Sequence, residues 1–157
     1  RLLFPVFYNK RLVGLVGRAL DKTLPKYYNY LNFPTAQYLG GYDEVKQFNF
    51  GKVFIVEGFF DVLSSFSFGM ANDTGFVCTW KSGMSRKHAE LLSGLDKRTF
   101  ICYDSDPAGK SGADAAIELL RPLIQGVRKI ELPEGKDPGD LVAAEWQTCL
   151  SRNGFSF

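Results

Sequence analysis

The sequence predicts an α/β fold, in which a mostly parallel sheet is flanked by helices and preceded by a small β-rich N-terminal segment. The first observation is a series of short apolar runs without polar alternation, which are typical of strands buried on both faces. The second is that a helical pattern follows each run, as in repeated βα units. The third is that this alternation starts only at Gly51. We therefore expect a β-rich basic segment over residues 1–50 and an α/β domain over residues 51–157.

The N-terminal segment is predicted to open with a β-hairpin. Leu2–Tyr8 and Arg11–Arg18 are rich in strand-forming residues, and Asn9-Lys10 between them suits a turn. From Asp21 to Phe50 the pattern is irregular and is interrupted by prolines and glycines, so we expect loops and short strands there. The tyrosines at positions 27, 28 and 30 are expected to fill a small core rather than to stack on bases.

The α/β domain is predicted to contain four strands, each followed by a helix. Ser85 is a suitable N-cap and Gly126 a suitable residue after a helix end. The predicted strands are Val53–Val56, Phe76–Thr79, Thr99–Tyr103 and Val127–Leu132, and the predicted helices are Phe59–Phe68, Ser85–Ser93, Ala108–Ile124 and one from about Gly139.

The composition excludes several classes of protein. A formal net charge of +2 gives no general polycation, so any contact with nucleic acid must come from local patches. No apolar run approaches the length of about 20 residues that spans a bilayer, so we expect no membrane segment. The cysteines at 78, 102 and 149 lie far apart, which predicts neither a disulfide framework nor a zinc site. These features indicate a cytoplasmic protein.

Acidic residues follow two of the predicted strands. Glu57 comes directly after Val53–Val56, and Asp104 and Asp106 follow Thr99–Tyr103. Parallel strands place their carboxyl ends at one edge of the sheet, so we expect these carboxylates to converge there. Clustered carboxylates repel one another unless a cation binds them, and such oxygen ligands favour Mg²⁺ or Mn²⁺. The alternative is that they only cap helices at solvent-exposed strand ends.

Two further acids have a less certain assignment. Asp61 lies in the first turn of the helix after Glu57, where it is either an outer ligand of the cation or a partner of the helix dipole. Asp137 follows the last predicted strand, where it is either a ligand or a cap of the final helix. Both alternatives stay open from the sequence.

A basic cluster precedes the predicted helix Ser85–Ser93. Lys81 and Arg86 lie beside the expected acidic edge, where positive charge and a helix N-terminus favour phosphate. A solvated loop lysine is an equally good interpretation of Lys81. His88 has no partner at a known spacing and is expected on the surface.

Three motifs together resemble the TOPRIM module, and in particular the DnaG-type bacterial DNA primases. The motifs are VEGFFDV at Val56–Val62, YDSDPAGKSGADAA at Tyr103–Ala116 and LPEGKDPGD at Leu132–Asp140. The basic N-terminal pattern, from Arg1 through Gly17-Arg18 to Lys26-Tyr27-Tyr28-Asn29, agrees with the same family. The resemblance extends from about Arg1 to Asp140. It implies that residues 1–50 are part of a primase RNA-polymerase domain and that residues 51–157 form the TOPRIM domain.

Two of the chain's departures from the family pattern lie in or beside the expected site. It has Asp137-Pro138-Gly139-Asp140 where the family often has Asp-Pro-Asp, so a second metal site is in doubt. It has Trp80-Lys81-Ser82 where the family usually has Leu-Gly-Thr. These departures indicate a divergent member, such as a phage protein in a bacterial host.

The resemblance implies metal-dependent synthesis of short RNA primers on a single-stranded DNA template from ribonucleoside triphosphates. A replicative helicase would bind through regions outside this chain. The alternatives are a TOPRIM metal-dependent nuclease and a non-catalytic TOPRIM module that binds nucleic acid. The implied catalytic residues are Glu57, Asp104 and Asp106, and the implied ligands of Mg²⁺ or Mn²⁺ are these three with Asp61 and Asp137. The residues expected to contact nucleic acid or nucleotide are Arg1, Arg18, Lys26 and Asn29, with Lys81 and Arg86 added by their position.

Overall fold

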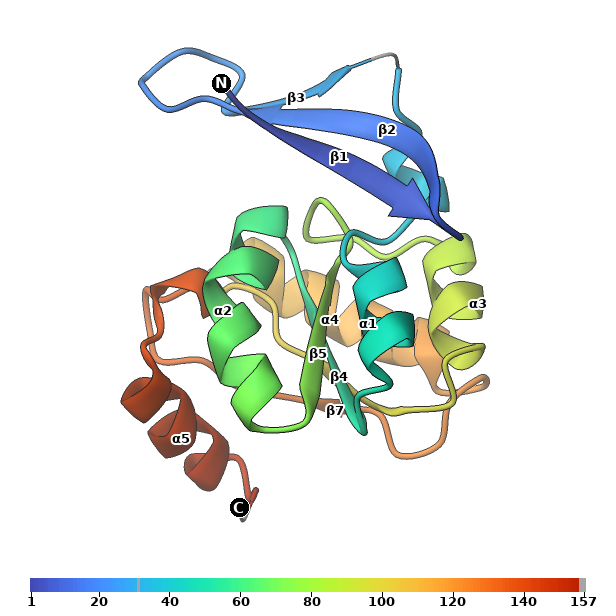
Figure 1. Cartoon of the computed structure of the whole chain (residues 1–157). Helices are drawn as coiled ribbons and strands as arrows, with labels where there is room; N and C mark the ends of the chain where they lie inside the picture. The colour runs from blue at the N-terminus through green and yellow to red at the C-terminus, as the bar shows by residue number, and fades with distance from the viewer. Residues whose placement is uncertain (31, 156–157) are drawn as a thin grey trace.

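The computed structural model of the chain describes residues 1–30 and 32–155 and contains two β-sheets, one above the other (Figure 1). The upper sheet has three antiparallel strands in the order β1-β2-β3, and the lower has four parallel strands in the order β5-β4-β6-β7. The predicted α/β fold with a β-rich N-terminal segment is therefore confirmed, although the predicted domain end at residue 157 lies outside the described residues. None of the helices in the described part of the chain is long and apolar enough to cross a membrane.

The upper sheet contains the predicted hairpin. β1 (Leu2–Tyr8) and β2 (Arg11–Arg18) pair in antiparallel register, and β3 (Tyr27–Tyr30) pairs with the second half of β2. At the turn, the backbone N–H groups of Asn9 and Lys10 donate to the two carboxylate oxygens of Asp43 at 2.9 and 2.7 Å. The hairpin tip is thereby fastened to the helix that contains Asp43.

That helix, α1 (Tyr42–Phe48), corrects the expectation of loops and short strands over Asp21–Phe50. Gly41 has φ +79° and is the N-cap, so the glycine pair that was interpreted as a break marks a helix start. The chain reaches this helix through a 3₁₀ turn, η1 (Thr35–Gln37).

The parallel sheet is built around β4 (Lys52–Val56), which lies between β5 (Thr74–Cys78) and β6 (Arg98–Ile101). Alternate residues of β4 face opposite cores, as the period of a strand requires. The last strand, β7 (Arg128–Lys129), is shorter than the predicted Val127–Leu132 because only Phe100 and Ile101 of β6 pair with it. The bounds of β1 and β2 match the prediction, and those of β4, β5 and β6 lie within two residues of it.

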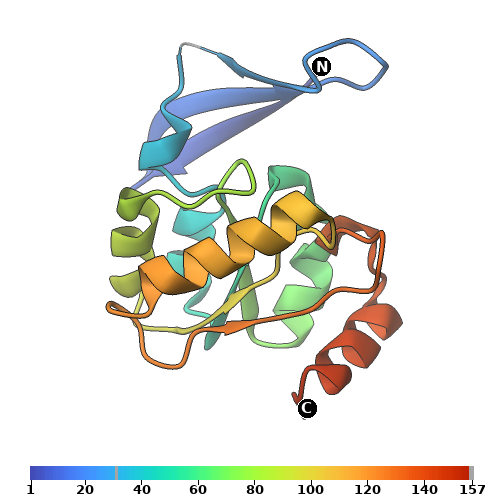
Figure 2. The ribbon, with the colours of Figure 1, turned by 180° about the vertical axis from the view of Figure 1, so that it is seen from behind.

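Helices cover both faces of the parallel sheet (Figures 1 and 2). The core on one face includes α1, α3 (Arg86–Ser93) and α4 (Pro107–Leu120), and the core on the other includes α2 (Phe59–Ala71) and α5 (Ala143–Arg152). The final helix starts later than the predicted Gly139 because a 3₁₀ turn, η2 (Pro138–Asp140), precedes it.

Aromatic rings join the upper sheet to the carboxyl edge of the parallel sheet. Phe4 of β1 packs on Phe59 at the start of α2, with ring centroids 5.3 Å apart. Phe59 stacks on Trp80, which follows β5, at 5.7 Å. The indole N–H of Trp80 donates to the carbonyl oxygen of Tyr38 at 2.7 Å. The upper sheet therefore lies over the edge where the predicted acids are found.

Trp146 should anchor α5 to the sheet. It is fully buried, and its ring stacks on Phe68 at 5.3 Å and meets Phe76 edge-on. We expect Trp146→Ala to lower the free energy of unfolding by about 3–5 kcal/mol, as other buried Trp truncations do. Urea denaturation measures this loss, with the exposed Gln147→Ala on the same helix as a control expected within about 0.5 kcal/mol of the parent. A loss below about 1 kcal/mol for Trp146→Ala would show that α5 is not part of the cooperative core.

Candidate metal centre

The strand order places Glu57 and Asp104 side by side. Glu57 directly follows β4, and Asp104 lies three residues beyond the neighbouring strand β6. The Oε1 atom of Glu57 accepts a hydrogen bond from the backbone N–H of Asp104 at 3.2 Å. Oδ1 of Asp104 is buried and has no hydrogen-bond partner in the described structure. The predicted convergence of these two acids is therefore observed, with one carboxylate oxygen left unsatisfied.

Asp106 has a structural role beside this pair. It is the N-cap of α4, and its Oδ1 atom accepts a hydrogen bond from the backbone N–H of Gly109 at 2.7 Å. Its charge still reaches the pair, because it raises the pKa values of Glu57 and Asp104. Asp106 therefore caps a helix, as the alternative to cation binding proposed, and also belongs to the acidic cluster, while its part as a metal ligand stays a prediction.

Asp61 and Asp137 meet on the neighbouring side of the cluster. Oδ2 of Asp61 accepts a hydrogen bond from the backbone N–H of Gly58 at 3.0 Å, and Oδ1 of Asp137 caps η2 by accepting from Asp140 N–H at 2.9 Å. Gly139 packs directly against Asp61, since a Cβ atom there would lie 2.8 Å from Asp61 Oδ1. Where the family pattern has an aspartate, this chain therefore has a glycine, and a side chain there would require the Asp61 carboxylate to shift.

The pKa values show the cost of gathering these acids. Burial, followed by repulsion from Asp104, raises the pKa of Glu57 to about 7. Burial and repulsion from Asp137 raise the pKa of Asp61 to about 7 and that of Asp104 to about 6. In each case partial loss of solvent is the largest cause. At neutral pH the cluster would be stabilised by added positive charge.

The carboxylates of this site fit one hard cation such as Mg²⁺, with most of its ligands supplied by water and substrate. Within residues 1–30 and 32–155, no group of three or more His, Cys, Asp or Glu side chains is placed to hold a metal ion. Mg²⁺, however, is commonly bound through one or two carboxylates, with waters and substrate phosphates completing its shell. Glu57 and Asp104, with its unsatisfied oxygen, meet that requirement. The participation of Asp61, Asp106 and Asp137 as ligands stays a prediction.

Two basic residues of the upper sheet face the acids. Arg18, at the end of β2, attracts Asp61 and lowers the pKa of that carboxyl against the larger effect of burial. Lys26, just before β3, likewise lowers the pKa of Asp104 against burial and repulsion. Positive charge from the N-terminal segment therefore lies across from the acidic cluster, and the contact of these two residues with nucleic acid or nucleotide stays a prediction.

Arg1 and Asn29 occupy the upper sheet away from direct contact with the acids. The Nη1 atom of Arg1 donates to the carbonyl oxygen of Pro25 at 2.7 Å, and its guanidinium lies 5.8 Å from the exposed ring of Tyr28. Asn29 is exposed and, two residues beyond Tyr27, shares its face of β3. Tyr27 packs in the small aromatic core below β2, as expected, whereas Tyr28 does not.

Lys81 and Arg86 are exposed around the loop between β5 and α3. Lys81 follows Trp80, and its carbonyl oxygen accepts a hydrogen bond from the Thr79 hydroxyl at 2.7 Å, which fixes the backbone but leaves the ammonium group in solvent. The expected surface position of His88 is wrong. Its side chain is fully buried and Nε2 lies 2.8 Å from the carbonyl oxygen of Thr35, a position that joins α3 to η1.

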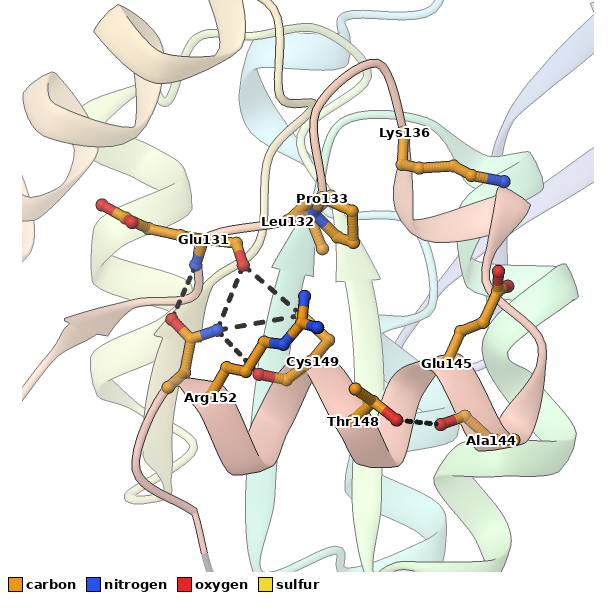
Figure 3. A pocket seen from close by; sticks show the side chains of 10 residues that line it. Glu131, Leu132, Pro133, Lys136, Ala144, Glu145, Thr148, Cys149 and Arg152 are labelled. Atoms are coloured by element: carbon orange, nitrogen blue, oxygen red, sulfur yellow. Dashed lines mark hydrogen bonds between the residues drawn. The ribbon is translucent and has the colours of Figure 1, made fainter.

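A separate pocket lies between α5 and the segment that follows β7 (Figure 3). It has a volume of about 530 Å³, and Asn153 closes one side through hydrogen bonds to Glu131 and Cys149. None of the acids described above lines it. The chemistry suggested by the sequence therefore does not depend on this pocket.

Sequence reasoning missed the surroundings of Arg18. Its guanidinium carbon lies 3.7 Å from the ring centroid of Phe60 and 5.6 Å from that of Tyr27. Phe60 reads in the sequence as one more apolar residue at a helix start. Only the placement of the upper sheet over α2 reveals the contact.

Curated relatives of the chain are bacterial DNA primases. The DNA primase of Clostridium acetobutylicum is 32% identical over 157 residues, which cover 97% of this chain and 26% of that protein. The DNA primase of Pseudomonas aeruginosa is 34% identical over 159 residues, covering 96% of this chain and 24% of that protein. The chain thus spans about a quarter of the length of these relatives.

Solved structures agree with the sequence relatives. A DnaG catalytic core matches with a TM-score of 0.82 and 28% identity over 96% of this chain and 52% of that one. A DNA primase domain from P. aeruginosa matches with a TM-score of 0.81 and 32% identity, over 96% of this chain and 50% of that one. A DnaG primase catalytic domain bound to single-stranded DNA matches with a TM-score of 0.81 and 28% identity, over 96% of this chain and 50% of that one. The predicted resemblance to DnaG-type primases is confirmed. The Toprim-like family matches residues 54–142, which are more than half of this chain, so the chain belongs to that family.

Proposed function

We propose that this chain is the catalytic part of a DNA primase, which makes short RNA primers on single-stranded DNA from ribonucleoside triphosphates. The observation that carries this proposal is the pair Glu57 and Asp104, set at the carboxyl edge of the sheet beneath basic residues of the upper sheet. The relatives, which are DNA primases, favour it over a metal-dependent nuclease or a non-catalytic binding module. Under this proposal the protein works in the cytoplasm, beside a replicative helicase that binds regions outside this chain.

Glu57 and Asp104 would hold Mg²⁺ or Mn²⁺, with Asp61, Asp106 and Asp137 as further proposed ligands whose charges act on this pair or on each other. Such an ion, when bound, supplies positive charge for the attacking 3′-hydroxyl and the triphosphate. Oδ1 of Asp104 supports this assignment because a buried carboxylate oxygen without a partner is costly. Gly139 supports a site with fewer carboxylates than the family pattern has.

The remaining work falls to side chains of this chain. Glu57, whose pKa is about 7, would either bind the ion or accept the proton of the attacking hydroxyl, because a base near neutral pKa is effective at neutral pH. Arg18 and Lys26, which belong to the N-terminal segment, would bind phosphate groups of the template or of the triphosphate through charge-assisted hydrogen bonds. The solved DnaG domain with single-stranded DNA supports this choice of template.

The stability of the chain should depend on pH and metal together. The folded-state pKa values of Glu57 and Asp104 lie above their ordinary values, so between about pH 4.5 and 7 the folded chain binds more protons than the unfolded chain. Stability without metal should therefore fall as pH rises through this window. Because Mn²⁺ binds the ionised carboxylates, we expect the rise in Tm on adding millimolar Mn²⁺ to be clearly larger at pH 8 than at pH 5.5.

A thermal unfolding series at both pH values measures this effect. Glu57→Gln should abolish most of the Mn²⁺-dependent rise and should reduce the pH dependence measured without metal, while the raised pKa values of Asp61 and Asp104 keep part of that dependence. Glu134→Gln, an exposed acid in the loop after β7, is the matched control and should behave as the parent. Equal Mn²⁺ stabilisation in Glu57→Gln and the parent would contradict the metal site.

Lys81 should contact phosphate if the loop after β5 borders the substrate. Lys81→Ala is expected to lower primer synthesis, or to raise the nucleotide concentration needed, by several-fold, because one hydrogen bond to a charged group is worth about 1–3 kcal/mol. Lys87→Ala, an exposed lysine of the same loop-helix region that pairs with Glu90 at 3.2 Å, should leave synthesis unchanged. Unaltered synthesis and nucleotide dependence in Lys81→Ala would leave Lys81 an ordinary surface residue.

A further inference from the structure

The guanidinium of Arg18 lies over two aromatic rings from different parts of the chain. Its guanidinium carbon lies 3.7 Å from the centroid of Phe60, a distance at which the planar group contacts the face of the ring. The same carbon lies 5.6 Å from the ring centroid of Tyr27. Tyr27 is the register partner of Arg18 across β2 and β3, whereas Phe60 is the second residue of α2. We call Phe60 and Tyr27 the aromatic clamp.

The aromatic clamp is itself fixed in place. Phe4 of β1 contacts Phe60, with ring centroids 6.5 Å apart, as well as its neighbour Phe59. The Tyr27 hydroxyl lies beside Gly58, since a Cβ atom added there would lie 3.6 Å from it. Gly58 and Phe60 lie within the short segment between Glu57 and Asp61, so the clamp ties the position of Arg18 to the backbone that carries these acids.

Stacking leaves the hydrogen-bonding edge of the guanidinium available. A guanidinium carries its five N–H donors in its own plane, so a ring against its face does not consume them. The ion pairs in the described residues join Lys87 to Glu90, Arg121 to Glu118 and Lys129 to Asp114, and Arg18 takes part in none of them. Arg18 is only half-buried, so a ligand can reach it. One donor is directed at Tyr27, because a side-chain hydrogen bond from Arg18 lowers the pKa of that tyrosine against burial. The arrangement therefore combines a fixed orientation with further N–H donors that remain for a ligand.

We propose that Phe60 is a positioning residue, which holds the Arg18 guanidinium against its ring so that the edge donors receive a phosphate group of the DNA template or of the incoming nucleotide. The proposal rests on the primase function proposed above and assigns a role that the charge of Arg18 alone would not require. An unclamped arginine would have to order a long, flexible side chain on each binding event. The aromatic clamp removes part of that cost before the ligand arrives.

The test compares aromatic and aliphatic residues at position 60. Affinities of the parent, Phe60→Leu and Phe60→Tyr for a fluorescent oligo(dT) and for ATP with Mg²⁺ are measured at fixed salt. Phe60→Leu should weaken binding of one of these two probes about three- to tenfold, and the affected probe identifies template or nucleotide as the source of the phosphate. Phe60→Tyr, which keeps the ring, should restore binding. Phe66→Leu, an exposed phenylalanine on the same helix, is the matched control and should bind as the parent.

Two further readouts separate positioning from packing. The Nε–Hε NMR signal of Arg18 should be shifted by the ring current of Phe60 in the parent and in Phe60→Tyr, and should move in Phe60→Leu. In a double-mutant cycle, Phe60→Leu should add little to Arg18→Lys, because both remove the same interaction. The salt slope of oligo(dT) binding should stay unchanged in Phe60→Leu, since no charge is removed.

The outcomes distinguish the role of Phe60 from the primase function on which it rests. A parent that binds neither oligo(dT) nor ATP contradicts the proposed primase function and the role of Phe60 with it. A parent that binds, together with a folded Phe60→Leu that binds both probes equally well, overturns the role of Phe60 alone. Additive losses in the double-mutant cycle, or a Phe60→Tyr variant as weak as Phe60→Leu, also overturn it. If Phe60→Leu does not fold, the comparison of Phe60→Tyr and Arg18→Lys with the parent, together with the NMR signal, decides the question.

Discussion

The repulsion between half-buried carboxylates at the end of β4 and β6 is the constraint on which the rest of this structure depends. These strands are neighbours, so Glu57 and Asp104 meet just beyond the carboxyl ends of the two strands. Burial and mutual repulsion raise the pKa values of both acids. A protein gains nothing in stability from such an arrangement, and strongly perturbed carboxylates in one place are a common mark of a functional site. Their surroundings are arranged to supply positive charge.

The upper sheet provides part of that charge and is itself held by aromatic contacts. Phe4, Phe59 and Trp80 form a continuous series of ring contacts from β1 to the residues that follow β5, tilted between Phe4 and Phe59 and stacked between Phe59 and Trp80. Trp80 has φ +69°, a left-handed conformation that costs a non-glycine residue about 1 kcal/mol or more, and its stacking and its hydrogen bond to Tyr38 offset that cost. The same packing that joins the sheets thus also sets the loop that carries Lys81.

Much of the α/β domain could be predicted because its signals are local. An apolar run such as Val53–Val56 has one good explanation, and an acid directly after it must lie at the sheet edge. Helix α1 could not be predicted, since Gly41 has the same appearance in a sequence whether it breaks a helix or starts one. The burial of His88 and the contact of Arg18 with Phe60 depend on segments more than 40 residues apart along the chain, and no local pattern reports such contacts.

The central claim is that the carboxylate pair exists to bind a divalent cation. Anomalous diffraction from crystals of the chain soaked in millimolar Mn²⁺ tests it most directly. The account predicts a peak within ligand distance, about 2.0–2.2 Å, of a carboxylate oxygen of Glu57 and of Asp104, with waters completing the shell. A peak bound elsewhere, or no peak at this edge of the sheet at a pH where both carboxyls are ionised, would contradict it.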